Sequence, residues 1–188
     1  MNPCRAARRL AVVALIALPG VLCAPRAAAQ AQIPSGREVV TPSAYVSLQP
    51  VPRGRAFQLA VALKIRPGFH INAREASLDY LIPTDLQASL PAGFRAGHVA
   101  YPKGTLRKFP FSPGKPLNVY AGTAVLRLPL TVLATAPLGA QRIPLKLRFQ
   151  ACSDEICLPP VTLSLDAELT VAAAGSAAKS VHAEFFPK

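Results

Sequence analysis

Apolar and polar residues alternate with a period of two over four long stretches of the chain. These alternations run through residues 57–66, 125–132, 142–149 and 161–171. Successive side chains of a β-strand point to opposite faces, so this period predicts strands with one buried face and one wetter face. Pro129 interrupts one of these runs. We expect an edge position or a bulge there, because proline has no backbone N–H to contribute to a sheet.

Shorter apolar runs predict further strands, and no stretch shows a helical stripe bounded by caps. The shorter strand candidates are residues 44–48, 86–90, 94–99 and 119–123. Turn signals lie at Pro67-Gly68, Pro91-Ala92-Gly93 and Pro113-Gly114. About seven to eight strands between such turns predict an all-β protein, and we expect an immunoglobulin-like β-sandwich, with a small barrel as the alternative.

The first 29 residues have the three parts of a signal peptide. A basic start ends at Arg9, an apolar stretch covers Leu10–Leu22, and small residues at Ala27–Ala29 offer a cleavage site. The apolar stretch has about 13 residues, fewer than the roughly 20 that a membrane-spanning helix needs, so a retained anchor is the weaker alternative. We expect cleavage after Ala29 and a periplasmic location.

Composition predicts one folded domain over residues 30–171. Hydrophobic residues make up 51% of the chain and charged residues 16%, which is enough apolar surface for a packed core. The 20 prolines argue against a mostly helical protein, because each lacks a backbone donor. After Val171 the sequence becomes low in complexity, and we expect a flexible tail over residues 172–188.

The formal charge of +12 falls to +8 when the four arginines of the signal peptide are removed. The remaining basic residues are scattered singly along the predicted strands and are not interleaved with aromatic residues. This distribution differs from the clustered basic patch of a nucleic-acid-binding surface. We therefore expect no nucleic-acid partner.

Cys152 and Cys157 are the two cysteines that remain after cleavage. They lie between the predicted strands at 142–149 and 161–171, so we expect the two sulfurs to face each other at a hairpin tip, close enough for a disulfide. Export favours the oxidised form. A loop of about six residues gains only about 2 kcal/mol from such a bond on the chain-entropy model.

Two functions are compatible with this pair. Thiol–disulfide exchange needs an accessible sulfur and a second sulfur to resolve the mixed disulfide, whereas a plain stabilising clip needs neither. Asp154 and Glu155 lie between the cysteines and disfavour a thiolate. The spacing Cys-x4-Cys also differs from the Cys-x-x-Cys of thioredoxin-like active sites.

The segment Phe-Gln-Ala-Cys-Ser-Asp-Glu-Ile-Cys-Leu-Pro-Pro at residues 149–160 resembles the active-site hairpin of the amino-terminal periplasmic domains of DsbD, the thiol:disulfide interchange protein. The similarity covers roughly residues 38–171 and includes Gly68–Asn72, Tyr101–Gly104 and Val119–Gly122. The resemblance implies an immunoglobulin-like domain. Its cysteine pair would take electrons from a membrane-embedded thiol carrier and pass them to thioredoxin-like periplasmic proteins, among them disulfide isomerases and the cytochrome c maturation reductase.

The resemblance also implies roles for individual residues. Cys157 matches the cysteine that attacks the client disulfide, and Cys152 matches the one that resolves it. The family has an aromatic cap loop that shields the pair, which makes Phe109, Phe111 and Tyr120 candidates for shielding; ordinary packing is the alternative. The chain would then be a component of a protein-disulfide reductase and would need no cofactor.

Two further alternatives remain from the residues themselves. A binding or assembly sandwich with a structural disulfide is one. A copper-handling protein is the other, since a cysteine pair with His70 or His98 is a plausible ligand set, although both histidines are isolated in sequence and we expect no metal site. The sequence contains neither the multi-helix membrane domain nor the thioredoxin-like domain of full-length DsbD. We therefore expect a separate subunit, a system with those domains encoded elsewhere, or another role.

Overall fold

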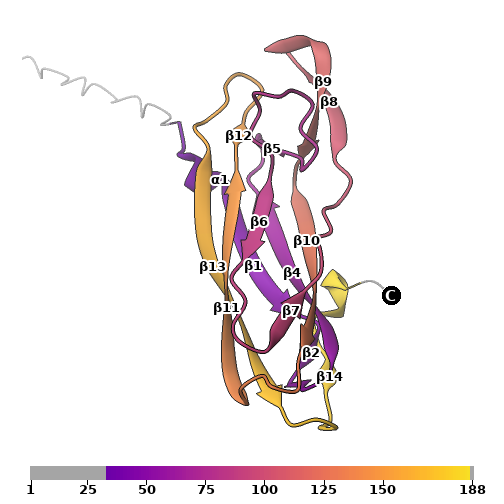
Figure 1. The fold of residues 1–188 in the computed structure, drawn as a ribbon. Coiled ribbons are helices and arrows are strands. Elements are labelled where there is room, and N and C mark those ends of the chain that lie inside the picture. The colour runs from indigo at the N-terminus through magenta and orange to yellow at the C-terminus, as the bar shows by residue number, and fades with distance from the viewer. Residues whose placement is uncertain (1–32, 187–188) are drawn as a thin grey trace, which may run out of the picture. The chain divides into compact units, whose positions relative to one another are not determined.

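The computed structural model describes residues 33–186, which are almost entirely β-structure (Figure 1). The expected signal peptide, residues 1–29, lies outside the described residues. In chain order the elements are α1 (Gly36–Val39), β1 (Val40–Val46), β2 (Leu48–Gln49), β3 (Val51–Pro52), β4 (Ala56–Ile65), β5 (His70–Asn72), β6 (Asp85–Ala88), β7 (Phe94–Ala96), β8 (Thr105–Phe109), β9 (Ser112–Tyr120), β10 (Thr123–Val132), β11 (Gly139–Phe149), β12 (Ala151–Cys152), β13 (Val161–Ala172), β14 (Lys179–Ser180) and η1 (Ala183–Phe185). Eight of these fourteen strands have four or more residues, in agreement with the number expected. Among the described residues, no helix is long and apolar enough to cross a membrane.

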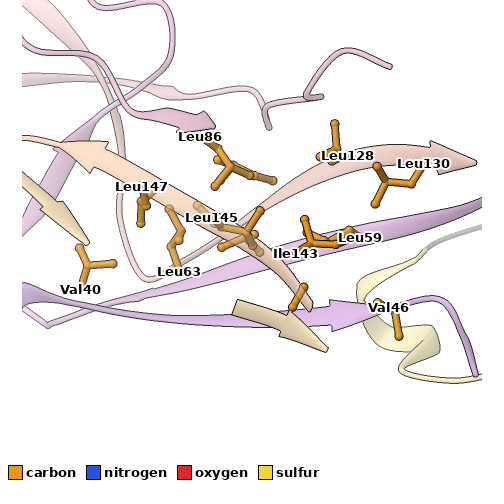
Figure 2. Packing of buried hydrophobic residues seen from close by; sticks show 14 of the residues in the cluster. Val40, Val46, Leu59, Leu63, Leu86, Leu128, Leu130, Ile143, Leu145 and Leu147 are labelled. Atoms are coloured by element: carbon orange, nitrogen blue, oxygen red, sulfur yellow. The ribbon is translucent and has the colours of Figure 1, made fainter. Parts of the chain in front are cut away.

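Two four-stranded sheets provide the faces of the main core. Their strand orders are β1-β4-β10-β7 and β3-β13-β11-β6. Leucines and an isoleucine from both sheets meet between them, as Figure 2 shows for Leu59 of β4, Leu128 of β10 and Ile143 of β11, each no more than 3% exposed. The predicted all-β, immunoglobulin-like β-sandwich is confirmed.

The four alternating stretches correspond to the longest strands, β4, β10, β11 and β13. In β11 every second residue from Ile143 to Phe149 is buried, as the period of two requires. β11 and β13 pair antiparallel along residues 139–149 and 161–171. This long hairpin fixes the position of residues 150–160, the segment with both cysteines, at its tip.

A third sheet, of order β12-β5-β9-β8, lies at the same end of the sandwich as this tip (Figure 1). A two-stranded sheet of β2 and β14 lies at the other end. The third sheet contains one of the two cysteines, because Cys152 is part of β12, which pairs with β5.

Several of the local predictions are wrong. Pro113-Gly114 is not a turn but part of β9, and the turn between β8 and β9 is formed by Pro110 and Phe111. Residues 44–48 do not form one strand, because β1 ends at Val46 and β2 begins at Leu48, and neither do residues 119–123, because β9 ends at Tyr120 and β10 begins at Thr123. Between them Gly122 has φ +68°, a left-handed conformation that glycine adopts without the Cβ clash of other residues.

Pro129 does not mark a sheet edge, since β10 lies between β4 and β7. Arg127 exchanges both backbone hydrogen bonds with Ala100, and the Pro129 carbonyl accepts one from Gly97, so both residues direct their polar groups away from β4. The missing N–H of Pro129 therefore faces this side too. Because the missing N–H points away from β4, the ladder between β10 and β4 loses no hydrogen bond. On the other side β7 pairs only with Leu130–Val132, so Pro129 lies outside that ladder.

The carboxy-terminal segment differs from the expected tail in its contacts. β13 continues to Ala172, and β14 then pairs with β2. The Phe185 ring stacks on Tyr45 at a centroid distance of 4.2 Å, and Arg127 Nε donates a hydrogen bond to the Phe185 carbonyl at 2.7 Å. The low-complexity residues thus connect β13 to β14 and η1, which contact the sandwich again. Composition alone does not reveal these contacts.

Candidate functional site

Cys152 and Cys157 are joined by a disulfide at the tip of the β11–β13 hairpin. They are antiparallel cross-strand partners with their Cα atoms 4.0 Å apart. The Leu158 N–H donates to the Ala151 carbonyl at 2.8 Å below the pair, and the Ser153 N–H donates to the Ile156 carbonyl at 2.8 Å above it. The predicted proximity of the two sulfurs at a hairpin tip is confirmed.

Burial distinguishes the two cysteines. Cys152 is 0% exposed, whereas Cys157 is an exposed residue at the end of the turn Ser153–Ile156. An attacking sulfur must approach a disulfide from outside, so the exposed Cys157 is the more accessible cysteine of the two. Cys152 lies behind it.

Gln150 ties this tip to the rest of the third sheet. Its side-chain oxygen accepts hydrogen bonds from Asn72 Nδ2 and from the Ile82 N–H, both at 3.3 Å. Its Nε2 donates to the Leu158 carbonyl at 3.3 Å, across the hairpin. Gln150, two residues before Cys152, therefore links both strands of the cysteine hairpin to β5.

The register of the third sheet shows which side chains share a face with Cys152. Cys152 lies opposite His70, and Ala151 lies opposite Ile71. Side chains alternate between faces, so His70 projects on the same face as Cys152 while Ile71 projects into the main core. Tyr120 pairs with Ile71 and therefore lies on the core face as well.

The face of Cys152 has an aromatic cover. His70 is 1% exposed, and its ring stacks on Phe109 with 4.1 Å between centroids. Phe109 is 3% exposed and packs with Leu81, Leu117 and Val119 in a small second cluster. Phe111 is 39% exposed and stacks on the outer side of Phe109 at 5.3 Å. Of the three shielding candidates, Phe109 thus covers His70, the cross-strand neighbour of Cys152, and Phe111 covers Phe109.

Tyr120 has a different environment. Its ring is buried in the main core, and its hydroxyl donates to the Pro102 carbonyl at 2.9 Å and accepts from the Arg74 N–H at 3.2 Å. Burial raises the pKa of this phenol. These contacts make Tyr120 a support for the third sheet, in contrast to the shielding expected for it.

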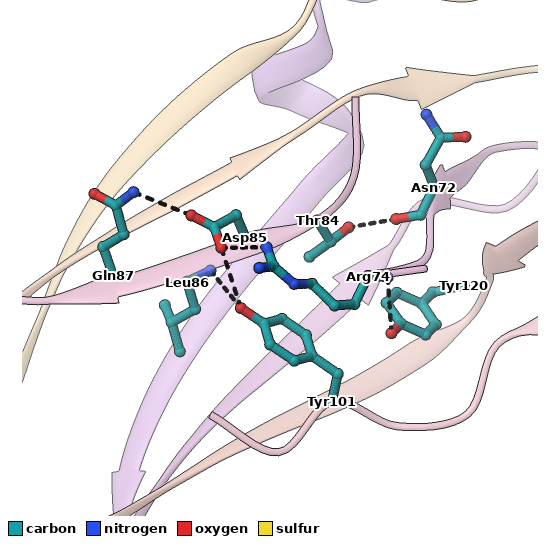
Figure 3. A network of polar contacts seen from close by, with 8 residues as sticks. All are labelled: Asn72, Arg74, Thr84, Asp85, Leu86, Gln87, Tyr101 and Tyr120. Atoms are coloured by element: carbon teal, nitrogen blue, oxygen red, sulfur yellow. Dashed lines mark hydrogen bonds and ion pairs between the residues drawn. The ribbon is translucent and has the colours of Figure 1, made fainter. Parts of the chain in front are cut away.

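A polar network beside Tyr120 fastens the third sheet to β6 (Figure 3). Asp85 accepts from the Arg74 guanidinium and from the Tyr101 hydroxyl, which in turn accepts from the Leu86 N–H at 3.0 Å. The Thr84 hydroxyl donates to the Asn72 carbonyl at 2.6 Å. The strand that contains His70 is therefore fixed at its end by several hydrogen bonds.

The charges nearest the cysteines are of both signs. Asp154 lies on the turn between them, and Arg107 Nη2 of β8 is 4.0 Å from its carboxylate, with both side chains well exposed. The Arg107 guanidinium also lies 5.1 Å from the centre of the Phe109 ring. An exposed pair of this kind contributes little to stability, but it places a positive charge against the acidic tip.

His70 is neutral at physiological pH. The pKa of its imidazole is lowered from 6.5 to about 4, chiefly by burial and also by nearby Arg107, while Asp154 partly opposes the shift. His98, the other histidine considered as a ligand, is exposed and follows β7 in a different sheet. Within residues 33–186 no group of three or more His, Cys, Asp or Glu side chains is placed to hold a metal ion.

The family comparison identifies this arrangement. The family described as "Thiol:disulfide interchange protein DsbD, N-terminal" matches residues 36–169, which include nearly all of the sandwich and both cysteines. The chain belongs to the DsbD amino-terminal domain family. Membership in this family indicates a role in thiol:disulfide interchange.

Solved structures give more distant similarities to this DsbD-type domain. The reduced DsbD amino-terminal domain of Neisseria meningitidis is 17% identical, with a TM-score of 0.42 over 77% of this chain and 91% of the other. A family 123 glycoside hydrolase from Clostridium perfringens is 11% identical, with a TM-score of 0.27 over 69% of this chain and 28% of the other. A search of curated proteins found no match.

Sequence reasoning missed the position of His70 in this DsbD-type site. The residue belongs to the segment Gly68–Asn72, which resembles the family, but along the chain it is an isolated histidine. Its place opposite Cys152 depends on the register between β5 and β12, which are about eighty residues apart in sequence. Arg107 was missed for the same reason, since its partner Asp154 is on another hairpin.

Proposed function

We propose that this domain is a periplasmic thiol:disulfide exchange module that works through Cys152 and Cys157. The observation that supports it most is the unequal burial of a bonded pair: Cys157 is an exposed residue at a hairpin tip, and Cys152 is fully buried. Exchange needs one accessible sulfur to attack and a second sulfur beside it to resolve the mixed disulfide, and a clip needs neither.

In the proposed reaction, the reduced domain donates two electrons to a client disulfide. The Cys157 thiolate attacks one client sulfur, forms a mixed disulfide and releases the other client sulfur as a thiolate that takes up a proton. Cys152 then loses its proton and attacks the Cys157 sulfur, which breaks the mixed disulfide and releases the second client thiol. The Cys152–Cys157 disulfide forms as the client is fully reduced, and electrons and protons balance.

The partners in this proposal are a membrane-embedded thiol carrier that reduces the pair and thioredoxin-like periplasmic proteins that oxidise it. Clients that act in disulfide isomerisation and in cytochrome c maturation belong to this second group. The domain would thus be one component of a protein-disulfide reductase system. Export by the signal peptide expected at residues 1–29 would bring it to the compartment of these clients.

We assign Phe109 the shielding role, with Phe111 on its outer side. The Phe109 ring covers His70 on the face of Cys152, and it belongs to a hairpin that ends in an exposed turn. A docking partner that displaces this hairpin would open the face of the pair. In the undocked domain the Cys152 side of the pair would then stay covered, and access would be limited to the side of Cys157.

A trapping experiment tests the proposed exchange. Reduced Cys152→Ala domain is mixed with a purified, oxidised thioredoxin-like protein, quenched with acid, alkylated and run on a non-reducing gel. We expect a mixed disulfide through Cys157 that a reductant removes. Cys157→Ala is the matched control and should trap nothing, because its remaining sulfur is enclosed.

If Cys152→Ala traps no more partner than Cys157→Ala, the exchange role is wrong. A double Cys→Ala variant that retained full function in cells would lead to the same conclusion, since a structural clip is then the only role left for the bond.

A further inference from the structure

His70 has a buried polar atom without a partner. Its Nε2 is enclosed and makes no hydrogen bond, and the residue is 1% exposed. Buried polar groups are nearly always hydrogen-bonded, and an orphaned one in a native protein calls for a physical explanation. The disulfide form of the site therefore leaves one group unsatisfied directly opposite Cys152.

Reduction creates a donor at this place. A disulfide sulfur carries no hydrogen, whereas the Cys152 thiol has an S–H that can donate, and an imidazole nitrogen without a hydrogen accepts. Cross-strand partners on one face have their Cβ atoms about 4.5–5.5 Å apart, within reach of a histidine ring. Opening the bond thus supplies the group that Nε2 lacks.

We propose that His70 is the hydrogen-bond partner of the Cys152 thiol in the reduced protein and a positioning residue that sets the redox equilibrium of the pair. The proposal rests on the proposed function in requiring that the pair opens. In the half-reaction, the disulfide gains two electrons and two protons. One proton stays on the Cys152 sulfur, shared with Nε2, and the other stays on Cys157 at the surface.

The surroundings of His70 favour a neutral acceptor over a cation. Phe109 stacks on its ring, and the charged groups that act on it, Arg107 and Asp154, have opposite signs and shift its pKa in opposite directions. Burial keeps the imidazole uncharged at neutral pH, as its lowered pKa indicates. A neutral acceptor stabilises the thiol, so it favours the reduced pair over the disulfide.

Equilibration with glutathione tests this. For His70→Phe, which keeps a planar ring against Phe109 and removes the nitrogens, we expect the equilibrium constant for oxidation by glutathione disulfide to rise at least threefold. The rise should be the same at pH 6 and pH 8, because His70 is neutral at both. His70→Gln, which offers an acceptor oxygen, should return towards the wild-type value, and His98→Gln, the same change at the exposed histidine, should match wild type.

Three results would overturn the proposal. An unchanged constant in His70→Phe shows that the nitrogen is not used. A change that His70→Gln does not reduce shows a packing effect, and a change confined to pH 6 shows a charged partner. Each of these differs from a failure of the exchange role, which the Cys152→Ala trap reports independently of His70.

Discussion

Burial and register separate residues that the sequence presents as equals. Cys152 and Cys157 are symmetric in the motif, but one is enclosed and the other exposed. His70 and His98 are both isolated along the chain, but only His70 lies opposite a cysteine. Differences at this scale come from pairing between distant strands, and chemistry at the tip depends on them.

The neutral state of buried His70 predicts an acid-sensitive stability. Its pKa is about 4 when folded and 6.5 in the reference state, so the unfolded chain binds more protons between these values. Stability therefore falls as the pH drops from about 6.5 to 4, by on the order of 3 kcal/mol from this residue. Urea unfolding of the oxidised domain at pH 7 and pH 4 measures it, with His70→Phe losing less. Equal losses in both proteins would contradict the burial of a neutral imidazole.

The β8–β9 hairpin is the element that joins the site to its surroundings. It presents the Phe109 ring to His70 and Arg107 to the acidic tip, and its turn bears the half-exposed Phe111. β8 is the edge of the third sheet, so its outer side has no strand partner among the described residues. An edge hairpin held by a small cluster can move with less loss of core packing than a central strand.

Alanine substitutions of Phe109 and Phe111 should have different effects on stability and on the rate of disulfide reduction. Phe109→Ala removes a nearly fully buried ring, and we expect a loss of about 3–5 kcal/mol in unfolding free energy together with faster reduction of the disulfide by dithiothreitol. Phe111→Ala removes a half-exposed ring and should cost less than about 1 kcal/mol. Stopped-flow reduction below the unfolding transition measures the rate. Equal reduction rates in wild type and Phe109→Ala would mean that this ring does not shield the pair.

The sequence predicts the elements in proportion to their regularity. The alternating runs that predict β4, β10, β11 and β13 cover eight to eleven residues each, and all four strands are present. β5 has three residues, all buried, so it shows no alternation. In β9 the exposed Pro113 and Gly114 resemble a turn, because this part of the strand extends past the core and needs no apolar face. The cysteine hairpin is predictable because two regular strands flank it, and the resemblance points to Phe109 and Phe111, whereas the place of His70 opposite Cys152 is not predictable.

The molecule as a whole does not depend on its disulfide for a core. Apolar side chains from two complete sheets fill the space between them, and the bond closes a loop at one end of the hairpin. A short loop contributes little unfolded-state entropy. The bond can therefore open and close while the sandwich stays folded, which an exchange protein requires.

Reduction should cost the fold about 2 kcal/mol, the chain-entropy value for a loop of about six residues. For a domain of this size this corresponds to a fall in Tm of roughly 4–8 °C. Thermal unfolding followed by circular dichroism, with and without a phosphine reductant, measures the difference. A reduced form that is unfolded at 25 °C would show instead that the bond is a necessary staple.

The reduction potential of the Cys152–Cys157 pair, measured against glutathione at pH 7, tests the exchange role most directly. Exchange proteins have potentials between about −270 and −120 mV, whereas structural disulfides in secreted proteins are typically below about −300 mV. We predict a value above about −300 mV, within the range of the exchange proteins. A value well below −300 mV would contradict the redox role and make the bond a structural clip.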